Sequence, residues 1–246
     1  PRMRSSDIVH AAVTDHRIPR EPGKPSRFSP PREEAPVIAA PLRPFYARWL
    51  TPAERKSPRD LGLALVQLAR DKQEHLDALP LALHLLEDAL AEHPRDLGVW
   101  EAKATCLLLL GQRLPEALAA CERVLAAAPE DEVALKLAGL VSLQLEEYET
   151  AQGYWRRAMT LNPWMAEYRA NFALALSRTG QWEEALRTCR KALDLDPFNA
   201  QARTLLAVCL HRQGDKSGAL AEFDKVRALQ PPDLDMLWEQ FRRETH

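Results

Sequence analysis

The chain has 246 residues and a formal net charge of −2, so no overall positive field favours nucleic acid as a partner. No apolar run approaches the roughly 18 residues that a membrane-spanning helix needs, so no membrane span is predicted. Because the sequence begins at Pro1, we expect a fragment or a processed product, and the lack of a signal peptide indicates no compartment.

Residues 1–20, PRMRSSDIVHAAVTDHRIPR, form a short basic and polar segment that contains two histidines. His10 and His16 are six positions apart, which places them on different faces of a helix. Spacing alone therefore does not predict a zinc site that both histidines share.

Residues 21–60 are expected to form an extended connector. Residues 1–60 hold 11 of the 19 prolines of the chain and show little helical periodicity. Composition leaves a second possibility open, a disordered tail over residues 17–40. The connector ends in the apolar run PFYARWL, and we expect Phe45, Tyr46 and Trp49 to pack on the structure that follows.

The most regular stretch, residues 166–199, predicts a pair of amphipathic helices. Tyr168, Phe172 and Leu176 recur at helical spacing and line one face of the first helix. Gly180 is expected to end this helix, because glycine enters the left-handed C-cap conformation without steric cost.

The second helix of this pair returns along the first. Ala185, Cys189 and Ala192 are expected to face inward, and Ala173 on the first helix leaves room for close approach. Pro197 ends the second helix, because proline cannot continue a helix and disfavours helix at the residue before it.

The same marks return along the chain with one period. The expected stop prolines are Pro94, Pro129, Pro163, Pro197 and Pro231. The return-helix alanines are Ala82, Ala117, Ala151, Ala185 and Ala219. Both series step by 35, 34, 34 and 34 residues, and this pattern resembles the tetratricopeptide repeat (TPR) family.

The resemblance implies an all-α fold, an α-solenoid of about five helix pairs over residues 61–246. The expected repeats cover residues 63–96, 97–131, 132–165, 166–199 and 200–233. A last amphipathic helix over residues 234–243 is expected to cap repeat five, with an apolar face of Leu234, Leu237, Trp238 and Phe241. Repeat one is the least regular, as terminal repeats often are: Arg70 is assigned to a position where other repeats carry a small residue, and the turn near residues 72–77 lacks glycine.

The family resemblance also implies a groove lined by the first helix of each pair. Carried onto this chain, its positions are Lys136, Leu140, Gln144, Ala170, Leu174, Arg178, Thr204, Val208 and Arg212. Such a groove has an apolar floor with two arginines in successive repeats, which suits an extended or helical peptide that carries acidic groups at one edge. The alternative is a solvated groove that only holds neighbouring domains of the same polypeptide.

Some TPR proteins bind chaperone tails through a Lys/Asn/Arg carboxylate clamp. Here Asn171 is the only groove-side asparagine at a suitable helix position, so the clamp pattern does not recur. The chaperone function is therefore not carried over to this chain.

The remaining polar residues predict no catalytic or metal site within the chain. Cys106, Cys121, Cys189 and Cys209 form no C-x-x-C motif, and we expect them to be small buried apolar residues. Nucleotide-binding, zinc-protease and nucleophile-elbow motifs are absent from the sequence. We therefore expect no enzyme activity within this chain, while a redox activity of a longer protein stays open.

The D-I-V-H…T-D-H-R-I run of residues 1–20 resembles a run in periplasmic multihaem c-type cytochromes fused to TPR domains. In that family the run follows a C-x-x-C-H-M-P haem-attachment motif, and here the chain opens with Pro-Arg, as if cut just behind it. The order of run, Pro-rich connector and repeats also matches. Val13 departs from the pattern, since a methionine often precedes T-D-H.

This second resemblance implies haem c attached upstream of the chain and none attached covalently within it. His10 and His16 become candidate distal axial ligands of haem iron, because neutral imidazole suits low-spin haem. Asp7 or Asp15 would hydrogen-bond the second ring nitrogen and fix the tautomer.

Two functional hypotheses follow from the sequence. In the first, the repeats are the protein-interaction module of a periplasmic multihaem c-type cytochrome that transfers electrons, and they hold a protein or peptide partner or the haem domain of the same polypeptide. In the second, the chain is a stand-alone TPR scaffold, cytoplasmic and without a redox role. The sequence immediately before Pro1 distinguishes the two hypotheses, because C-x-x-C-H motifs there favour the first.

Overall fold

The computed structural model describes residues 57–72 and 76–245, and every regular element within these ranges is helical. The connector residues Phe45, Tyr46 and Trp49 and the histidines His10 and His16 lie outside the described residues. Their predicted packing and ligand roles therefore stay predictions.

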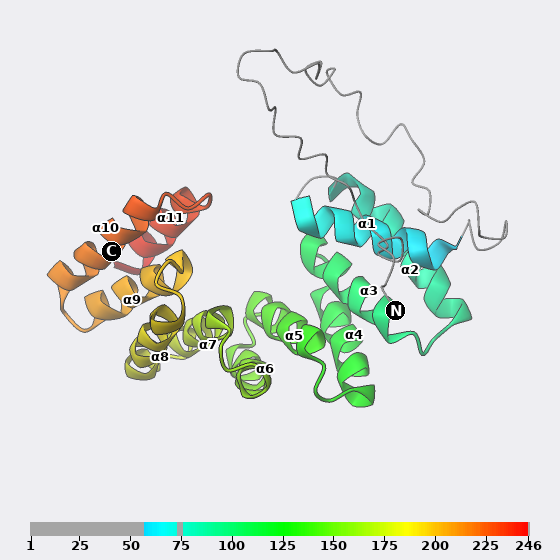
Figure 1. The fold of residues 1–246 in the computed structure, drawn as a ribbon, viewed down its shortest axis with the longest axis horizontal. Coiled ribbons are helices and arrows are strands. Elements are labelled where there is room, and N and C mark those ends of the chain that lie inside the picture. Colours follow the sequence, from blue (N-terminus) through cyan, green and yellow to red (C-terminus); the bar gives the residue numbers. More distant parts are fainter. Residues whose placement is uncertain (1–56, 73–75, 246) are drawn as a thin grey trace, which may run out of the picture. The chain divides into compact units, whose positions relative to one another are not determined.

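The described residues form five helix pairs and a final helix (Figure 1). The pairs are α1 (Pro58–Lys72) with α2 (Leu79–Glu92), α3 (Leu97–Leu110) with α4 (Leu114–Ala127), α5 (Glu132–Gln144) with α6 (Tyr148–Leu161), α7 (Ala166–Arg178) with α8 (Trp182–Leu195), and α9 (Ala200–Arg212) with α10 (Lys216–Leu229). A short 3-10 turn, η3 (Leu76–Ala78), precedes α2, and α11 (Leu234–Thr245) ends the described chain. The predicted all-α fold of stacked pairs is confirmed for these residues.

The packing order explains how the first helices come to share a face. Each helix from α1 to α9 packs against the next one along the chain. In addition, α1 contacts α3, α3 contacts α5, α5 contacts α7 and α7 contacts α9. These five helices therefore form one continuous row, called here the first-helix row.

The helix ends follow from local chemistry. Asp96, Asp131, Asn199 and Asp215 precede helices, and each side chain accepts a hydrogen bond from the backbone N–H three residues further on. Such caps satisfy N–H groups that have no partner inside the helix. At the other end, α8 stops at Leu195, two residues before Pro197, as the sequence predicted.

The turns within the second to fifth pairs each contain a left-handed residue at one shared repeat position. Gly111, Gly180 and Gly214 have φ of 62°, 79° and 90°, so the glycine predicted at position 180 is confirmed as the helix terminator. The third pair carries Glu146 at the equivalent position, with φ of 60°. An L-residue with a side chain is strained in this region, because its Cβ crowds the following carbonyl group.

We expect Glu146→Gly to raise the free energy of unfolding by about 1 kcal/mol, because glycine removes the left-handed strain. Urea denaturation followed by circular dichroism measures the change. The reverse substitution at the matching turn, Gly180→Glu, should lower stability by a similar amount. Equal midpoints for wild type and Glu146→Gly would contradict this account of the turn.

The first helix of each pair carries one small buried residue where the second helix crosses it. This series is Ala69, Ala104, Gly139, Ala173 and Ala207. All five residues are buried. The assignment of Arg70 to this position was wrong by one residue, because Ala69 fills it and Arg70 lies on the exposed side of α1.

The second helices supply the matching contacts. The five return-helix alanines predicted from the period, at positions 82, 117, 151, 185 and 219, are all 0% exposed. Cys121 and Cys189 share one repeat position with Trp155, and all three are buried, which confirms their predicted apolar role. A Cβ atom at Gly139 would lie 2.6 Å from the Trp155 ring, so the largest residue at this position faces the smallest.

The final helix α11 packs against α9 and the end of the fifth pair. Its predicted apolar face is confirmed: Leu237 and Phe241 are 2% and 4% exposed. The Phe241 ring stacks on the Phe223 ring of α10, with centroids 4.7 Å apart. The Trp238 ring centroid lies 5.2 Å from that of Phe223. Burial of this face holds α11 on the repeats.

Candidate functional site

The surface of the first-helix row is the candidate site, because the predicted groove residues all lie on α5, α7 and α9. The structure divides these nine residues into a buried group, a group in ion pairs and a remaining group. Their exposure and contacts decide which of them a partner could reach.

Ala170, Thr204 and Val208 belong to the interior of the fold. Ala170 and Thr204 are 0% exposed and Val208 is 2% exposed. The Thr204 hydroxyl donates to the Ala200 carbonyl one turn earlier, and Val208 shares an apolar cluster with Leu237 of α11. With α11 in place, these three residues are covered by the fold and are not open to a partner.

The central part of the row is open and mostly neutral. Lys136 of α5 pairs with Glu167 of α7, with Nζ to carboxylate oxygen 3.0 Å. Leu140 and Leu174 are half-buried against the main core, and Gln144 is exposed at the end of α5. This part offers two apolar side chains and an amide, and its one predicted cation is already paired.

Arg178 and Arg212 lie at the ends of α7 and α9, and both side chains are partly exposed, at 37% and 47%. Both guanidinium groups contact the Glu244 carboxylate of α11. The Arg212 Nη2 atom is 3.3 Å from Glu244 Oε2, and Arg212 also lies over the Trp182 ring. The Glu244 side chain is only 15% exposed. The two arginines therefore bind an acidic group, and that group belongs to the same chain.

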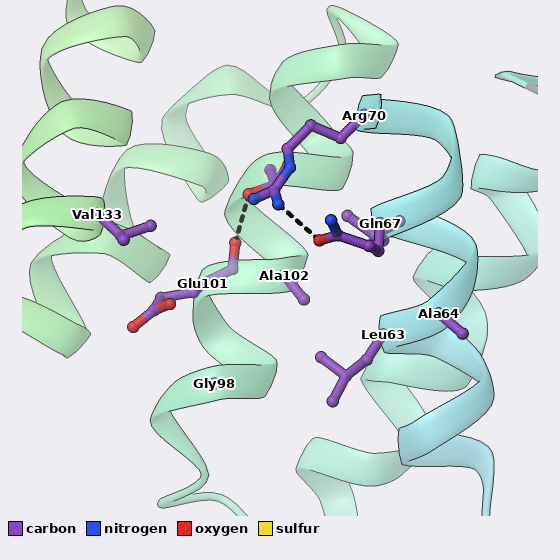
Figure 2. A pocket seen from close by; sticks show the side chains of 10 residues that line it. Leu63, Ala64, Gln67, Arg70, Gly98, Glu101, Ala102 and Val133 are labelled. Atoms are coloured by element: carbon purple, nitrogen blue, oxygen red, sulfur yellow. Dashed lines mark hydrogen bonds between the residues drawn. The ribbon is translucent and has the colours of Figure 1, made fainter. Parts of the chain in front are cut away.

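A hollow of about 370 Å³ lies at the other part of the row, and the sequence did not predict it. Its lining residues come from α1, α3 and α5: Leu63, Ala64, Val66, Gln67, Arg70, Gly98, Glu101, Ala102, Thr105 and Val133. Figure 2 shows Arg70 directed across the hollow from α1, while Glu101 on α3 points away from it toward α5. Arg70 donates to Gln67 Oε1 at 2.6 Å. Val133 is the large apolar side chain exposed on this surface, at 48%.

The repeat period contained a signal for this hollow. Glu101 and Thr105 lie 35 residues before Lys136 and Leu140, so they occupy the same repeat positions as two predicted groove residues. Extending the predicted set by one repeat toward the N-terminus would have included both. The charge at this position changes from acidic Glu101 to basic Lys136 between neighbouring repeats.

Two carboxyl groups, those of Glu101 and Asp131, lie on the α5 side of the hollow. Burial raises the pKa of Glu101, and the nearby Asp131 carboxylate raises it further through charge repulsion and a shared hydrogen bond. Asp131 also caps α5, where its side chain accepts from the Ala134 N–H at 2.8 Å. The surface on the α5 side of the hollow is therefore acidic, whereas Arg70 supplies a positive charge on the α1 side.

We expect Glu101→Gln to raise the melting temperature at pH 7. A pKa raised on folding means that the charged carboxylate at pH 7 opposes folding, and glutamine removes the charge while it keeps the shape. The gain should vanish as the pH falls below about 4, where the carboxyl group is protonated in both states. Thermal unfolding between pH 3.5 and 7.5 tests this.

The matched control is Glu116→Gln, whose carboxyl group has the opposite shift. A hydrogen bond from Arg113 lowers the pKa of Glu116, so its substitution should lower rather than raise the melting temperature at pH 7. A loss of stability in both variants would contradict the claim that Glu101 is repelled by Asp131 in the folded chain.

No metal-binding cluster is found among the described residues. No group of three or more His, Cys, Asp or Glu in that part of the chain could hold a metal ion. Burial raises the pKa of Cys106 to about 11 and that of Cys121 to about 12, so both thiols stay protonated near neutral pH. Across the same residues, no helix is long and apolar enough to cross a membrane.

Comparison with known proteins agrees with this geometry. The family model described as tetratricopeptide repeat matches residues 63–132 and 170–233, just over half of the chain. No curated protein matches the sequence.

Several solved structures share the fold. MamA from Desulfovibrio magneticus RS-1 is 22% identical, with a TM-score of 0.61 over 70% of this chain and 95% of that protein. MamA from AMB-1 is 24% identical, with a TM-score of 0.61 over 70% of this chain and 96% of the other. YrrB, described as a TPR protein with an unusual peptide-binding site, is 24% identical, with a TM-score of 0.58 over 77% of this chain and 94% of its own. At these identities the likeness concerns the fold alone.

Proposed function

Because this chain belongs to the tetratricopeptide repeat family, we propose that it is a non-catalytic scaffold that binds a protein or peptide partner along the first-helix row. The observation that carries the proposal is the hollow between α1, α3 and α5, with exposed Val133 beside acidic Glu101. YrrB, which shares the fold, is described as having a peptide-binding site. Recognition by a helical scaffold of this kind combines apolar anchors with a few charged contacts.

The hollow favours a peptide with an apolar anchor and a basic neighbour. Val133 and the apolar wall of α1 supply contact for the anchor. Glu101 and Asp131 supply negative charge on the α5 side, away from Arg70 on α1.

We expect Val133→Glu to weaken peptide binding at least about tenfold, or about 1.4 kcal/mol, because it places a charge where the apolar anchor would pack. Peptides are first selected from a displayed random library with the intact chain, and affinities are then measured by calorimetry. The matched control is Leu220→Glu, since Leu220 is 58% exposed on α10, which lies outside the row. Equal affinities for the two variants, or no selected peptide at all, would remove the hollow from the account.

We also propose a second, narrower function from residues 1–20. The D-I-V-H…T-D-H-R-I run, followed by the Pro-rich connector and the repeats, supports a place as the C-terminal part of a periplasmic multihaem c-type cytochrome. His10 and His16 would then bind iron of haem c attached upstream, and the repeats would hold an electron-transfer partner or the haem domain itself. The stand-alone scaffold, cytoplasmic and without haem, is the competing proposal.

Absorption spectra of the full-length protein from its native compartment separate these two proposals. Sharp c-type bands after reduction with dithionite support the cytochrome, and His10→Ala should then convert one low-spin haem to high spin. A spectrum with protein absorption only would contradict the cytochrome and leave the scaffold.

A further inference from the structure

Helix α11 has the surface of a helical ligand. Its side chains toward the repeats are Leu234, Leu237, Trp238, Phe241 and Glu244, which recur at three- and four-residue steps. The opposite side is mostly polar. Its one large apolar side chain is that of Met236, which is 64% exposed. Anchors at this spacing, on a helix with one covered face, are how amphipathic helices bind to grooves.

The position of α11 coincides with residues that the family resemblance assigns to partner binding. Val208 of α9 is buried in the same cluster as Leu237 and Phe241. Arg178 and Arg212 of the predicted groove both hold Glu244. Thus three of the nine predicted groove residues already have a ligand, and it is the end of the same chain.

The carboxylate contact exceeds what a simple cap requires. A cap of the last repeat needs an apolar face over Phe223 and its neighbours, and Leu237, Trp238 and Phe241 provide it. Glu244 lies beyond this face and is bound by arginines from two different repeats, 66 and 32 positions away in sequence. Paired guanidinium groups are suited to recognising a carboxylate with a defined direction.

We propose that the surface beneath α11 is a binding site for an amphipathic helix of a partner protein, and that α11 is its internal competitor. The partner helix would carry apolar anchors like those of α11 and a carboxylate three residues beyond the last anchor, placed between Arg178 and Arg212. This proposal rests on the proposed scaffold function and names the kind of ligand that one end of the row takes.

The connection to the fifth pair allows such an exchange. Helix α10 ends at Leu229 and α11 begins at Leu234, and the four residues between them include Gln230 in the left-handed region and two prolines. Because α11 is the last described helix, its departure interrupts none of the five pairs. If α11 left and nothing replaced it, Phe223 and Val208 would be exposed to water. The surface is therefore more stable with another apolar helix bound than uncovered.

The probe for this proposal is a fluorescent peptide of residues 233–245, DLDMLWEQFRRET, added to the intact chain and followed by anisotropy. In the wild-type chain, α11 competes and the peptide should bind weakly. In Glu244→Lys the internal helix is repelled by both arginines, so the peptide should bind at least about tenfold tighter than to wild type. The matched control is Glu239→Lys on the same helix, since Glu239 pairs with Arg242 away from the repeats and should leave binding unchanged.

A charge exchange tests the carboxylate directly. A peptide with Glu244→Lys should not bind the Glu244→Lys chain, but it should bind a chain with Arg178→Glu and Arg212→Glu. Binding of both peptides to the Glu244→Lys chain with equal affinity would overturn the proposal, because apolar contact alone would then explain it. If Glu244→Lys prevents folding, Glu244→Gln removes the charge without repulsion and should give a smaller gain of the same kind.

No gain of peptide binding in a folded Glu244 variant would also overturn the proposal and leave α11 as a cap only. That failure is distinguishable from failure of the scaffold function. The Val133 comparison reports on the hollow between α1, α3 and α5, whereas the α11 peptide reports on the ends of α7 and α9.

Discussion

The arrangement of the repeats depends on close contact between the two helices of each pair. One small residue on each first helix makes this contact possible, and the third pair shows how little room is left: a methyl group at Gly139 would lie 2.6 Å from Trp155. Where the facing residue is Cys121 or Cys189, an alanine is tolerated on the first helix. The sizes of the two residues are therefore matched pair by pair, as close packing requires.

This contact also determines where function can lie. Because each pair packs in the same way, the first helices contact one another in sequence and align equivalent side chains at steps of 34 or 35 residues. The identity of those side chains then varies freely from repeat to repeat. Here the variation gives a hollow with Arg70 on α1 and Glu101 on α3, and two arginines at the ends of α7 and α9. A common scaffold thus acquires a charge pattern of its own.

The period of the sequence predicted much of the fold, because helix pairing depends on local spacing. Stop prolines, buried alanines and the left-handed glycine at position 180 all have local causes. The error at Arg70 also has a local cause, since the first repeat lacks a glycine to fix its register and a shift of one residue exchanges a buried position for an exposed one.

The candidate site was less predictable, because it depends on contacts between distant residues. The contact of Glu244 with Arg178 and Arg212 spans up to 66 residues, and repeat spacing alone does not predict it, because it joins side chains of three helices. Burial of Thr204 and Val208 likewise depends on the packing of the fifth pair and α11. The predictions for His10 and His16 rest on resemblance alone and concern residues outside those described.

The central claim is that α11 occupies a site that can be exchanged, and hydrogen exchange of the intact chain tests it most directly. The account predicts that amides of α11 exchange through local opening, faster than those of α9 and α10, and that Glu244→Lys accelerates α11 alone. If α11 exchanged only at the rate of global unfolding in both chains, it would be an inseparable part of the fifth pair, and the claim would be contradicted.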